Sequence, residues 1–234
     1  MRRHSLEPAY LLSARPYSDT SLLLEAFTLN EGRVGIIARG ARGPRSKLRG
    51  LLQALQPLLL SWTQAGELGT LTGAEADGAP VVLAGERVFY AWYLNELVLK
   101  LLARHDAHPR LFERYAEALP LLAGAGYEAA LRLFEKHLLA EIGYGLLLPP
   151  TIDLALSYSY DPEQGPLPGA GAEGLAGASL VALRDERIEA FDARALADAR
   201  KLLRAALRRQ LGGKELATPK LLRQMRGADG SGRH

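Results

Sequence analysis

The sequence predicts an α+β protein with a β-rich N-terminal domain over residues 1–78 and an α-helical domain over residues 79–234. Up to residue 78, short apolar runs alternate with turn residues, which is typical of β-strands. From Gly85 onward, apolar residues recur every three or four positions, which is the spacing of amphipathic helices. The length of 234 residues is sufficient for one large domain or two small ones.

Five short strands are expected in the first domain, over residues 9–14, 20–29, 33–39, 57–63 and 67–72. Asn30 and Glu31 precede Gly32 at a spacing suited to a hairpin in which the glycine takes a positive φ. So many strands in so short a segment indicate a small barrel or a sandwich. Its packed interior is expected to include Leu55, Leu58, Leu60 and Trp62.

Helices are expected over residues 88–102, 110–122 and 128–142. Pro109 can open the second, Gly124 and Gly126 break it, and Gly143 ends the third. Residues 149–177 contain five prolines and many glycines, so we expect a loop or a poorly ordered insert there. A short helical piece over 179–183 follows, and Asp192 is a plausible N-cap for a long helix that Gly212 and Gly213 stop. A last short helix is expected over 220–225, with a disordered tail from residue 227 to 234.

The chain contains no cysteine, which excludes disulfides, thiolate nucleophiles and cysteine-ligated metal sites. A reducing cytoplasm fits this composition. The N-terminus lacks the apolar stretch of a secretory signal, and no apolar run is long enough to span a membrane. We therefore expect a cytoplasmic protein.

Charge is distributed unevenly along the chain, although the formal net charge is only +3. Both ends are basic and the middle is acidic: residues 1–50 carry +5, residues 51–193 carry −10 and residues 194–234 carry +8. This pattern indicates a polyanionic partner that contacts both ends. Solvated surface cations are the alternative interpretation, and charge alone does not separate DNA, RNA and acidic protein surfaces.

The segment from residue 33 to residue 50 is the most informative one. It holds six cations and no carboxylate, with glycines that let the backbone approach a phosphate chain. We expect it to bind nucleic acid, the alternative being a mobile loop that is basic only for solubility. The cations are Arg33, Arg39, Arg42, Arg45, Lys47 and Arg49.

A second basic element is the long helix near the C-terminal end. Arg200, Arg204 and Arg208 lie one turn apart on it, and Lys214 follows after the two glycines. An anionic partner would relieve the repulsion between cations four residues apart. A solvated helix face is the equally acceptable alternative.

Two aromatic side chains of the first domain are distinguished by their surroundings. Tyr17 stands beside Arg15 and Pro16 at an expected loop, which makes it a candidate for stacking on a base. Trp62 lies within an apolar strand and is expected in the core.

No catalytic constellation, metal site or cofactor site is expected. Residues 169–174 match a dinucleotide-binding string, but they follow prolines instead of a strand. His105 and His108 lack a third metal ligand nearby, and Glu135 and His137 face different sides of their helix. The chain is therefore expected to be a binding protein and not an enzyme.

Several segments together resemble the RecO family of recombination mediators. The residues that carry the likeness lie at 9–22, 32–42, 49–53, 56–60, 66–68, 71, 74–75, 93–97, 131–135, 143–145, 211–214 and 222–223. They include Asp19-Thr20-Ser21, Ala38-Arg39-Gly40-Ala41-Arg42, Asn95-Glu96-Leu97 and Leu211-Gly212-Gly213-Lys214. The likeness spans most of the chain and is interrupted over residues 146–177.

The resemblance implies an N-terminal OB-fold barrel, a helical domain, and binding and annealing of single-stranded and double-stranded DNA in repair and recombination at the nucleoid. It also implies RecR and the acidic C-terminal tail of single-stranded DNA-binding protein as partners, and indirect help in loading RecA at gaps. Many family members carry a four-cysteine zinc site in the region corresponding to 150–175. This chain resembles the cysteine-free branch, so no zinc is expected.

Two interpretations stay open beside this one. A ribosome- or RNA-associated OB-fold protein would also carry two basic ends, and an enzyme with an unrecognised site is a third class. Within the helical domain, Arg132 is a candidate for binding the partner tail through its terminal carboxylate, beside Leu131 and Phe134. A structural salt bridge from Arg132 to Glu128 or Glu135 is the alternative explanation.

Overall fold

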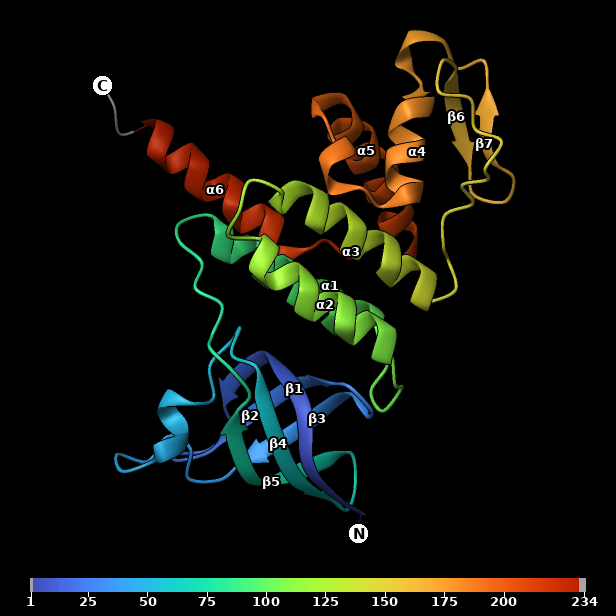
Figure 1. Ribbon diagram of the computed structural model, residues 1–234. Helices are drawn as coiled ribbons and strands as arrows, with labels where there is room; N and C mark the ends of the chain where they lie inside the picture. The colour runs from blue at the N-terminus through green and yellow to red at the C-terminus, as the bar shows by residue number, and fades with distance from the viewer. Residues whose placement is uncertain (1, 232–234) are drawn as a thin grey trace. The chain divides into compact units, whose positions relative to one another are not determined.

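The computed structural model describes residues 2–231 and divides the chain into two compact units. Unit 1 contains residues up to Pro120 together with those from Leu216 onward, and unit 2 contains Leu121–Glu215. The chain therefore leaves unit 1 once and returns to it (Figure 1). The domain boundary expected at residue 78 stays a prediction.

A closed five-stranded barrel forms the first part of unit 1, with strand order β1-β2-β3-β5-β4. All neighbouring strands are antiparallel except β3 and β5, which pair in parallel. This is the OB-like barrel that was expected. Its strands are β1 (Arg2–Pro16), β2 (Leu22–Thr28), β3 (Gly32–Ala38), β4 (Leu58–Gln64) and β5 (Leu68–Ala76).

The barrel interior follows the period of two along its strands. Leu58, Leu60 and Trp62 alternate on β4 and are fully buried, and Leu55 is also buried, as the sequence predicted. Strand β1 begins seven residues earlier than expected, at Arg2 instead of residue 9. The polar first half of β1 pairs with β4, and the pattern of apolar residues does not predict this pairing.

Helices cover the outer side of β1 and β2 within unit 1. Helix α1 (Arg87–Leu101) is followed by α2 (Pro109–Leu121), and Phe112 and Tyr115 of α2 pack against Tyr10 and Phe27 of the barrel. The last helix, α6 (Ala217–Ser231), lies against α1. It is longer than the expected helix over 220–225. The tail that was expected to be disordered from residue 227 is helical as far as Ser231. Residues 232–234 lie outside the described part of the chain.

Unit 2 is built around α3 (Tyr127–Glu141), α4 (Gly177–Asp185) and α5 (Ala193–Gln210). Helix α5 packs against both α3 and α4. Asp192 caps α5 as predicted, because its carboxylate accepts a hydrogen bond from the Ala195 N–H at 2.7 Å. Gly212 and Gly213 both have positive φ where α5 ends, as a helix stop requires.

The expectation of a loop over residues 149–177 is wrong. The segment contains a three-stranded sheet of order β7-β6-β8, made by β6 (Ser157–Asp161), β7 (Gly165–Pro168) and β8 (Leu175–Ala176) (Figure 1). Two of its five prolines, Pro166 and Pro168, lie on the edge strand β7, where a missing N–H is tolerated. The Asp161 carboxylate accepts hydrogen bonds from the Glu163 and Gln164 N–H groups and so forms the hairpin turn.

Three single-turn helices complete the described elements. They are η1 (Lys47–Gly50) in the connection between β3 and β4, η2 (Gly171–Glu173) and η3 (Ile188–Ala190). Within residues 2–231, no helix is both long and apolar enough to cross a membrane.

Candidate nucleic-acid interface

The basic segment between β3 and β4 is folded into successive turns. Gly40 takes a φ of +70°, and the Gly43 N–H then donates to the Gly40 carbonyl at 3.0 Å. The Ser46 N–H donates to the Gly43 carbonyl at 3.1 Å, and the Ser46 hydroxyl caps η1 by accepting from the Leu48 N–H. The segment therefore presents its side chains from a backbone that is folded into hydrogen-bonded turns.

Apolar side chains anchor this segment to the barrel. Ala41 and Leu52 are buried in the barrel core, and Leu48 and Leu51 pack against it. Cations and apolar residues alternate through η1, so the apolar ones face the core and the charged ones face solvent. The hydrophobic contacts thus fix the direction in which the cations point.

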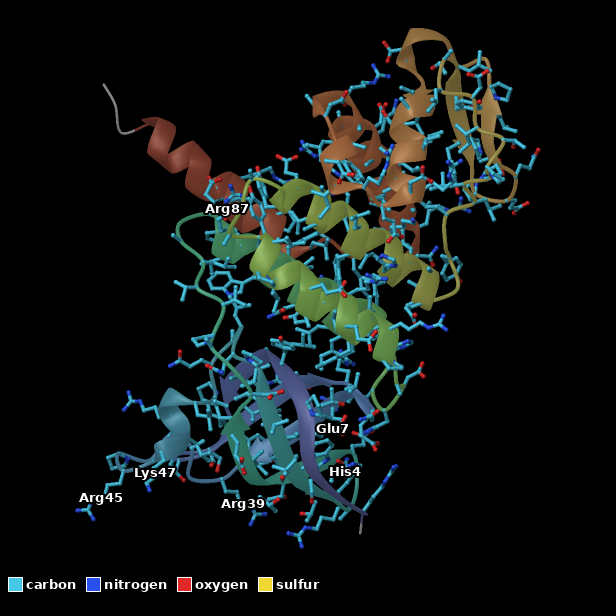
Figure 2. The ribbon with its side chains drawn as sticks, viewed as in Figure 1. His4, Glu7, Arg39, Arg45, Lys47 and Arg87 are labelled. Carbon is cyan, nitrogen blue, oxygen red and sulfur yellow. The ribbon has the colours of Figure 1, made fainter. Side chains whose placement is uncertain are left out.

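Five cations of this segment are exposed, and one of them, Arg42, donates a side-chain hydrogen bond to another loop. The other four are Arg39, Arg45, Lys47 and Arg49. We call these four residues the cation ridge. Among the side chains that the structure describes, none of the four has a carboxylate within 4.0 Å. In Figure 2, Arg45 and Lys47 extend away from the barrel, and Arg39 lies nearer to it at the end of β3. Unpaired and exposed, these charges are available to an anionic ligand.

Arg42 has a different role from the ridge. Its backbone N–H donates to the Thr20 carbonyl at 2.8 Å, and its guanidinium Nη1 donates to the Ser18 carbonyl at 2.9 Å. Both acceptors lie in the turn between β1 and β2. Arg42 therefore joins the ridge segment to that turn.

The turn between β1 and β2 carries the other candidate residues of the barrel. Tyr17 is 55% exposed, and its N–H donates to the Ser21 carbonyl at 3.1 Å, which closes the turn. Arg15 is exposed at the end of β1. The structure thus brings Arg15 and Tyr17 to the same side of the barrel as the segment that carries the ridge. Trp62, by contrast, lies in the core, as predicted.

Arg33 does not belong to this surface. Its guanidinium is partly buried and donates to the Leu99 carbonyl at the end of α1, and the neighbouring Arg104 pairs with Glu25. Burial lowers the pKa of Arg33; Glu25 opposes this effect and Arg104 adds to it. Arg33 therefore links the barrel to α1, and we leave it out of the interface.

Helix α5 carries a second basic surface, in unit 2. Leu202, Leu203 and Leu207 are buried, whereas Arg204 and Arg208 are exposed on the opposite side. Lys214 is exposed just beyond the end of the helix. These three cations have no carboxylate within 4.0 Å among the described side chains.

Arg200 is occupied by a partner on α3. Its guanidinium pairs with the Glu128 carboxylate, which also accepts the Tyr127 hydroxyl at 2.8 Å. Burial acts to raise the pKa of Glu128, but the Tyr127 and Arg200 hydrogen bonds outweigh it, so this pKa is lowered. Glu128 is thus charged at neutral pH, and a phosphate would have to compete with it for Arg200.

Arg132 on α3 pairs with Glu135 at 2.7 Å, so the structural alternative weighed for it is present. Its side chain is only 12% exposed, and among the described residues its Nε has no hydrogen-bond partner. Leu131 and Phe134 beside it are buried. A terminal carboxylate could reach Arg132 only if this part of the surface opened.

Sequence reasoning missed the roles of Ser18 and Thr20, which act through their carbonyl oxygens. Every residue carries such an oxygen, so no side-chain pattern could indicate them. Within the described part of the chain, no group of three or more His, Asp or Glu side chains is placed to hold a metal ion.

Comparison with known proteins agrees with this architecture. Residues 1–78 match the family model "Recombination protein O N terminal", and residues 83–149 match "Recombination protein O C terminal". The DNA repair protein RecO of Dechloromonas aromatica is 44% identical, over 94% of this chain and 95% of that protein. The DNA repair protein RecO of Coxiella burnetii is 42% identical, over 94% of this chain and 99% of that protein. That of Nitrosococcus oceani is 46% identical, over 94% of each chain.

The match thus covers both the barrel and the start of the helical region, at an identity that leaves no doubt about common descent. This chain belongs to the RecO family of DNA repair and recombination proteins, which are recombination mediators and not enzymes.

Proposed function

We propose that this protein binds single-stranded and double-stranded DNA through the cation ridge and anneals complementary strands during repair. The observation that carries the proposal is the ridge itself: Arg39, Arg45, Lys47 and Arg49 are exposed and unpaired on a folded segment that hydrophobic contacts hold to the barrel. A phosphate backbone supplies the regularly spaced anions that such a row of cations can neutralise.

Arg15 and Tyr17 extend the proposed interface. Arg15 adds a cation on the same side, and the exposed ring of Tyr17 offers a face on which a base can stack. Stacking is worth about 1–3 kcal/mol per base and tolerates every base, so it suits a protein that binds without sequence preference. Unstacked bases are available only in single strands, so Tyr17 favours single-stranded DNA.

Annealing requires that two polyanions approach each other. A second basic surface, formed by Arg204, Arg208 and Lys214, could screen another strand, with Arg200 joining it if Glu128 releases its guanidinium. Screening of phosphate repulsion needs no covalent chemistry. We propose that the two surfaces together promote annealing and so help to load the recombinase RecA at gaps.

Protein partners follow from family membership. We propose that RecR and the acidic C-terminal tail of single-stranded DNA-binding protein bind this chain, the tail at Arg132. Tail binding there requires displacement of the Glu135 carboxylate, which already accepts a hydrogen bond from Arg132. If Arg132→Glu left the affinity for a tail peptide unchanged, the site would have to be elsewhere.

The decisive experiment measures the affinity of the full chain for single-stranded oligonucleotides across a salt series. Each phosphate contact contributes about −0.7 to the slope of log K against log salt concentration, so replacing the four ridge cations with alanine should flatten the slope by about 3. A matched control replaces four exposed cations elsewhere in unit 1 with alanine: Arg3, Arg110, Lys220 and Arg223.

The control variant should keep most of the slope. An unaltered slope in the ridge variant would show that the ridge is not the phosphate site. If the wild-type protein did not bind oligonucleotides even in dilute buffer, the proposal of DNA binding would be wrong. Annealing is then followed with fluorescently labelled complementary strands, and binding of structured RNA is measured in parallel.

A further inference from the structure

Arg42 makes both of its described hydrogen bonds to main-chain oxygens of another loop. The guanidinium is 2.9 Å from the Ser18 carbonyl and the backbone N–H is 2.8 Å from the Thr20 carbonyl. The sequence groups Arg42 with the ridge cations, but a side chain committed to a carbonyl has lost part of its capacity to donate to a phosphate.

The two bonds from Arg42 fix the conformation of the turn that bears Tyr17. Tyr17 closes this turn through its N–H to the Ser21 carbonyl, and the carbonyls of Ser18 and Thr20 in between are those that Arg42 engages. Ser21 is buried at the far end of the turn, so one end is anchored and the other carries the exposed ring. The orientation of Tyr17 therefore depends on Arg42.

We infer that Arg42 is a positioning residue that aligns the Tyr17 ring with the cation ridge, so that one single strand can place phosphates on the ridge and a base on the tyrosine. This inference rests on the proposed DNA binding and refines it: Arg42 sets the preference for single-stranded over double-stranded DNA. A duplex has no free base to stack on Tyr17, so its binding gains little from the alignment.

The inference separates Arg42 from the ridge in a way that salt dependence detects. A phosphate contact releases counterions, and its loss flattens the salt slope by about 0.7 for a single strand. A positioning residue leaves the slope unchanged when it is replaced. We therefore expect Arg42→Met to weaken single-strand binding about tenfold at constant slope, a change within the range of one lost base stack.

The test is a double-mutant cycle on the full chain, with oligo(dT) and a duplex of equal length as probes. If Arg42 acts through Tyr17, Arg42→Met has little further effect in a Tyr17→Leu background. Arg45→Met is the matched control. It should flatten the salt slope and weaken the binding of both probes, and its effect on the binding free energy should add to that of Tyr17→Leu. Arg42→Gln, which has no charge but keeps an N–H donor for the Ser18 carbonyl, should recover part of the single-strand affinity that Arg42→Met loses.

The other outcomes overturn the inference. A flatter slope for Arg42→Met, additivity with Tyr17→Leu, equal losses for both probes, or no loss at all would each make Arg42 an ordinary phosphate contact or a bystander. Failure of the proposed function looks different, since Arg45→Met would then also leave binding unchanged. Thermal unfolding of each variant verifies that the fold is kept, and Arg42→Gln serves for the comparison if Arg42→Met does not fold.

Discussion

The side chains of Asn95 on α1 and Tyr115 on α2 meet inside unit 1, where the Tyr115 hydroxyl donates to the Asn95 side-chain oxygen. The Asn95 nitrogen donates in turn to the Leu12 carbonyl of β1 at 3.1 Å. Both residues are buried, and burial raises the pKa of Tyr115 far above its usual value. This pair therefore connects both helices to the barrel through neutral hydrogen bonds that water does not reach.

Tyr115→Phe should lower the free energy of unfolding by about 1–3 kcal/mol, because the buried Asn95 oxygen loses its donor. Urea denaturation followed by far-ultraviolet circular dichroism measures the change. Tyr144→Phe is the control, since Tyr144 is exposed and its replacement should cost less than about 0.5 kcal/mol. Equal stabilities of the two variants would show that the buried hydrogen bond contributes nothing.

Gly32 and Gly40 both have positive φ but differ in the space around them, so substitutions at the two positions can be compared directly. A Cβ on Gly32 would lie 1.8 Å from the Asp106 carbonyl oxygen, whereas nothing lies within 4 Å of a Cβ on Gly40. Gly40→Ala should therefore cost only the backbone strain, about 1–2 kcal/mol. Gly32→Ala should cost several kcal/mol more or prevent folding, and similar melting temperatures for the two variants would contradict the close approach.

Glu96 holds the start of α6, because its carboxylate accepts hydrogen bonds from the Ala217 and Thr218 N–H groups at 2.7 and 2.9 Å. Burial acts to raise the pKa of Glu96, but these bonds, with Lys100, outweigh it and lower the pKa. Since the folded pKa lies below the unfolded one, this stabilisation is complete above the unfolded value of about 4.5 and is lost as the pH falls through the folded value.

We therefore expect the amide protons of α6 to lose protection against hydrogen exchange selectively below pH 4.5, and Glu96→Gln to weaken that protection already at pH 7. Glu113→Gln on the exposed side of α2 is the control. If α6 kept its protection in Glu96→Gln, its docking would depend on its other contacts with α1.

Asp19 is an exposed carboxylate between the two residues whose carbonyls bind Arg42. It places a negative charge within the proposed DNA interface. Asp19→Asn should tighten single-strand binding about twofold in dilute buffer, since two charges some 7 Å apart in water interact by about 0.6 kcal/mol. The gain should vanish near 1 M salt, where the screening length is about 3 Å. Weaker binding by Asp19→Asn would show that the carboxylate is needed to shape the turn.

Asp198 on α5 is the carboxylate that fastens the small sheet of unit 2. It accepts hydrogen bonds from the Ala176 N–H at 3.0 Å, the Ser179 hydroxyl at 2.7 Å and the Arg194 Nε at 2.9 Å. Asp198→Ala should destabilise unit 2 by about 2–3 kcal/mol, because the buried Ser179 hydroxyl and the part-buried Ala176 N–H lose their acceptor. Asp185→Ala, on the exposed end of α4, is the control and should change the free energy of unfolding little.

Local signals in the sequence predicted most of the secondary structure. Alternation placed Leu58, Leu60 and Trp62 inside the barrel, and Asp192, Gly212 and Gly213 marked the ends of α5. The sheet within residues 149–177 was missed because proline and glycine usually interrupt elements, whereas here Gly165, Pro166 and Pro168 form an edge strand. The turn depends on a single carboxylate, Asp161, which no periodicity reveals.

The candidate site was predictable in composition but not in the roles of its members. The ridge cations are exposed, as their density without carboxylates indicated. Arg33 and Arg42 look the same as the others in the sequence, yet each donates to a carbonyl far away in the chain, at Leu99 and Ser18. Only the fold brings those oxygens to them, so a count of charges does not reveal which cations already donate to an oxygen of the protein.

The path of the chain also bears on how the protein is made. The barrel, α1 and α2 leave the ribosome first, but α6, which packs on α1, follows only after the whole of unit 2 has been synthesised. During translation the α6-binding side of α1 therefore stays uncovered by α6 until unit 2 has been made. A cut in unit 2 after folding would leave α6 attached to its neighbour by non-covalent contacts alone, of which the Glu96 hydrogen bonds are a central part.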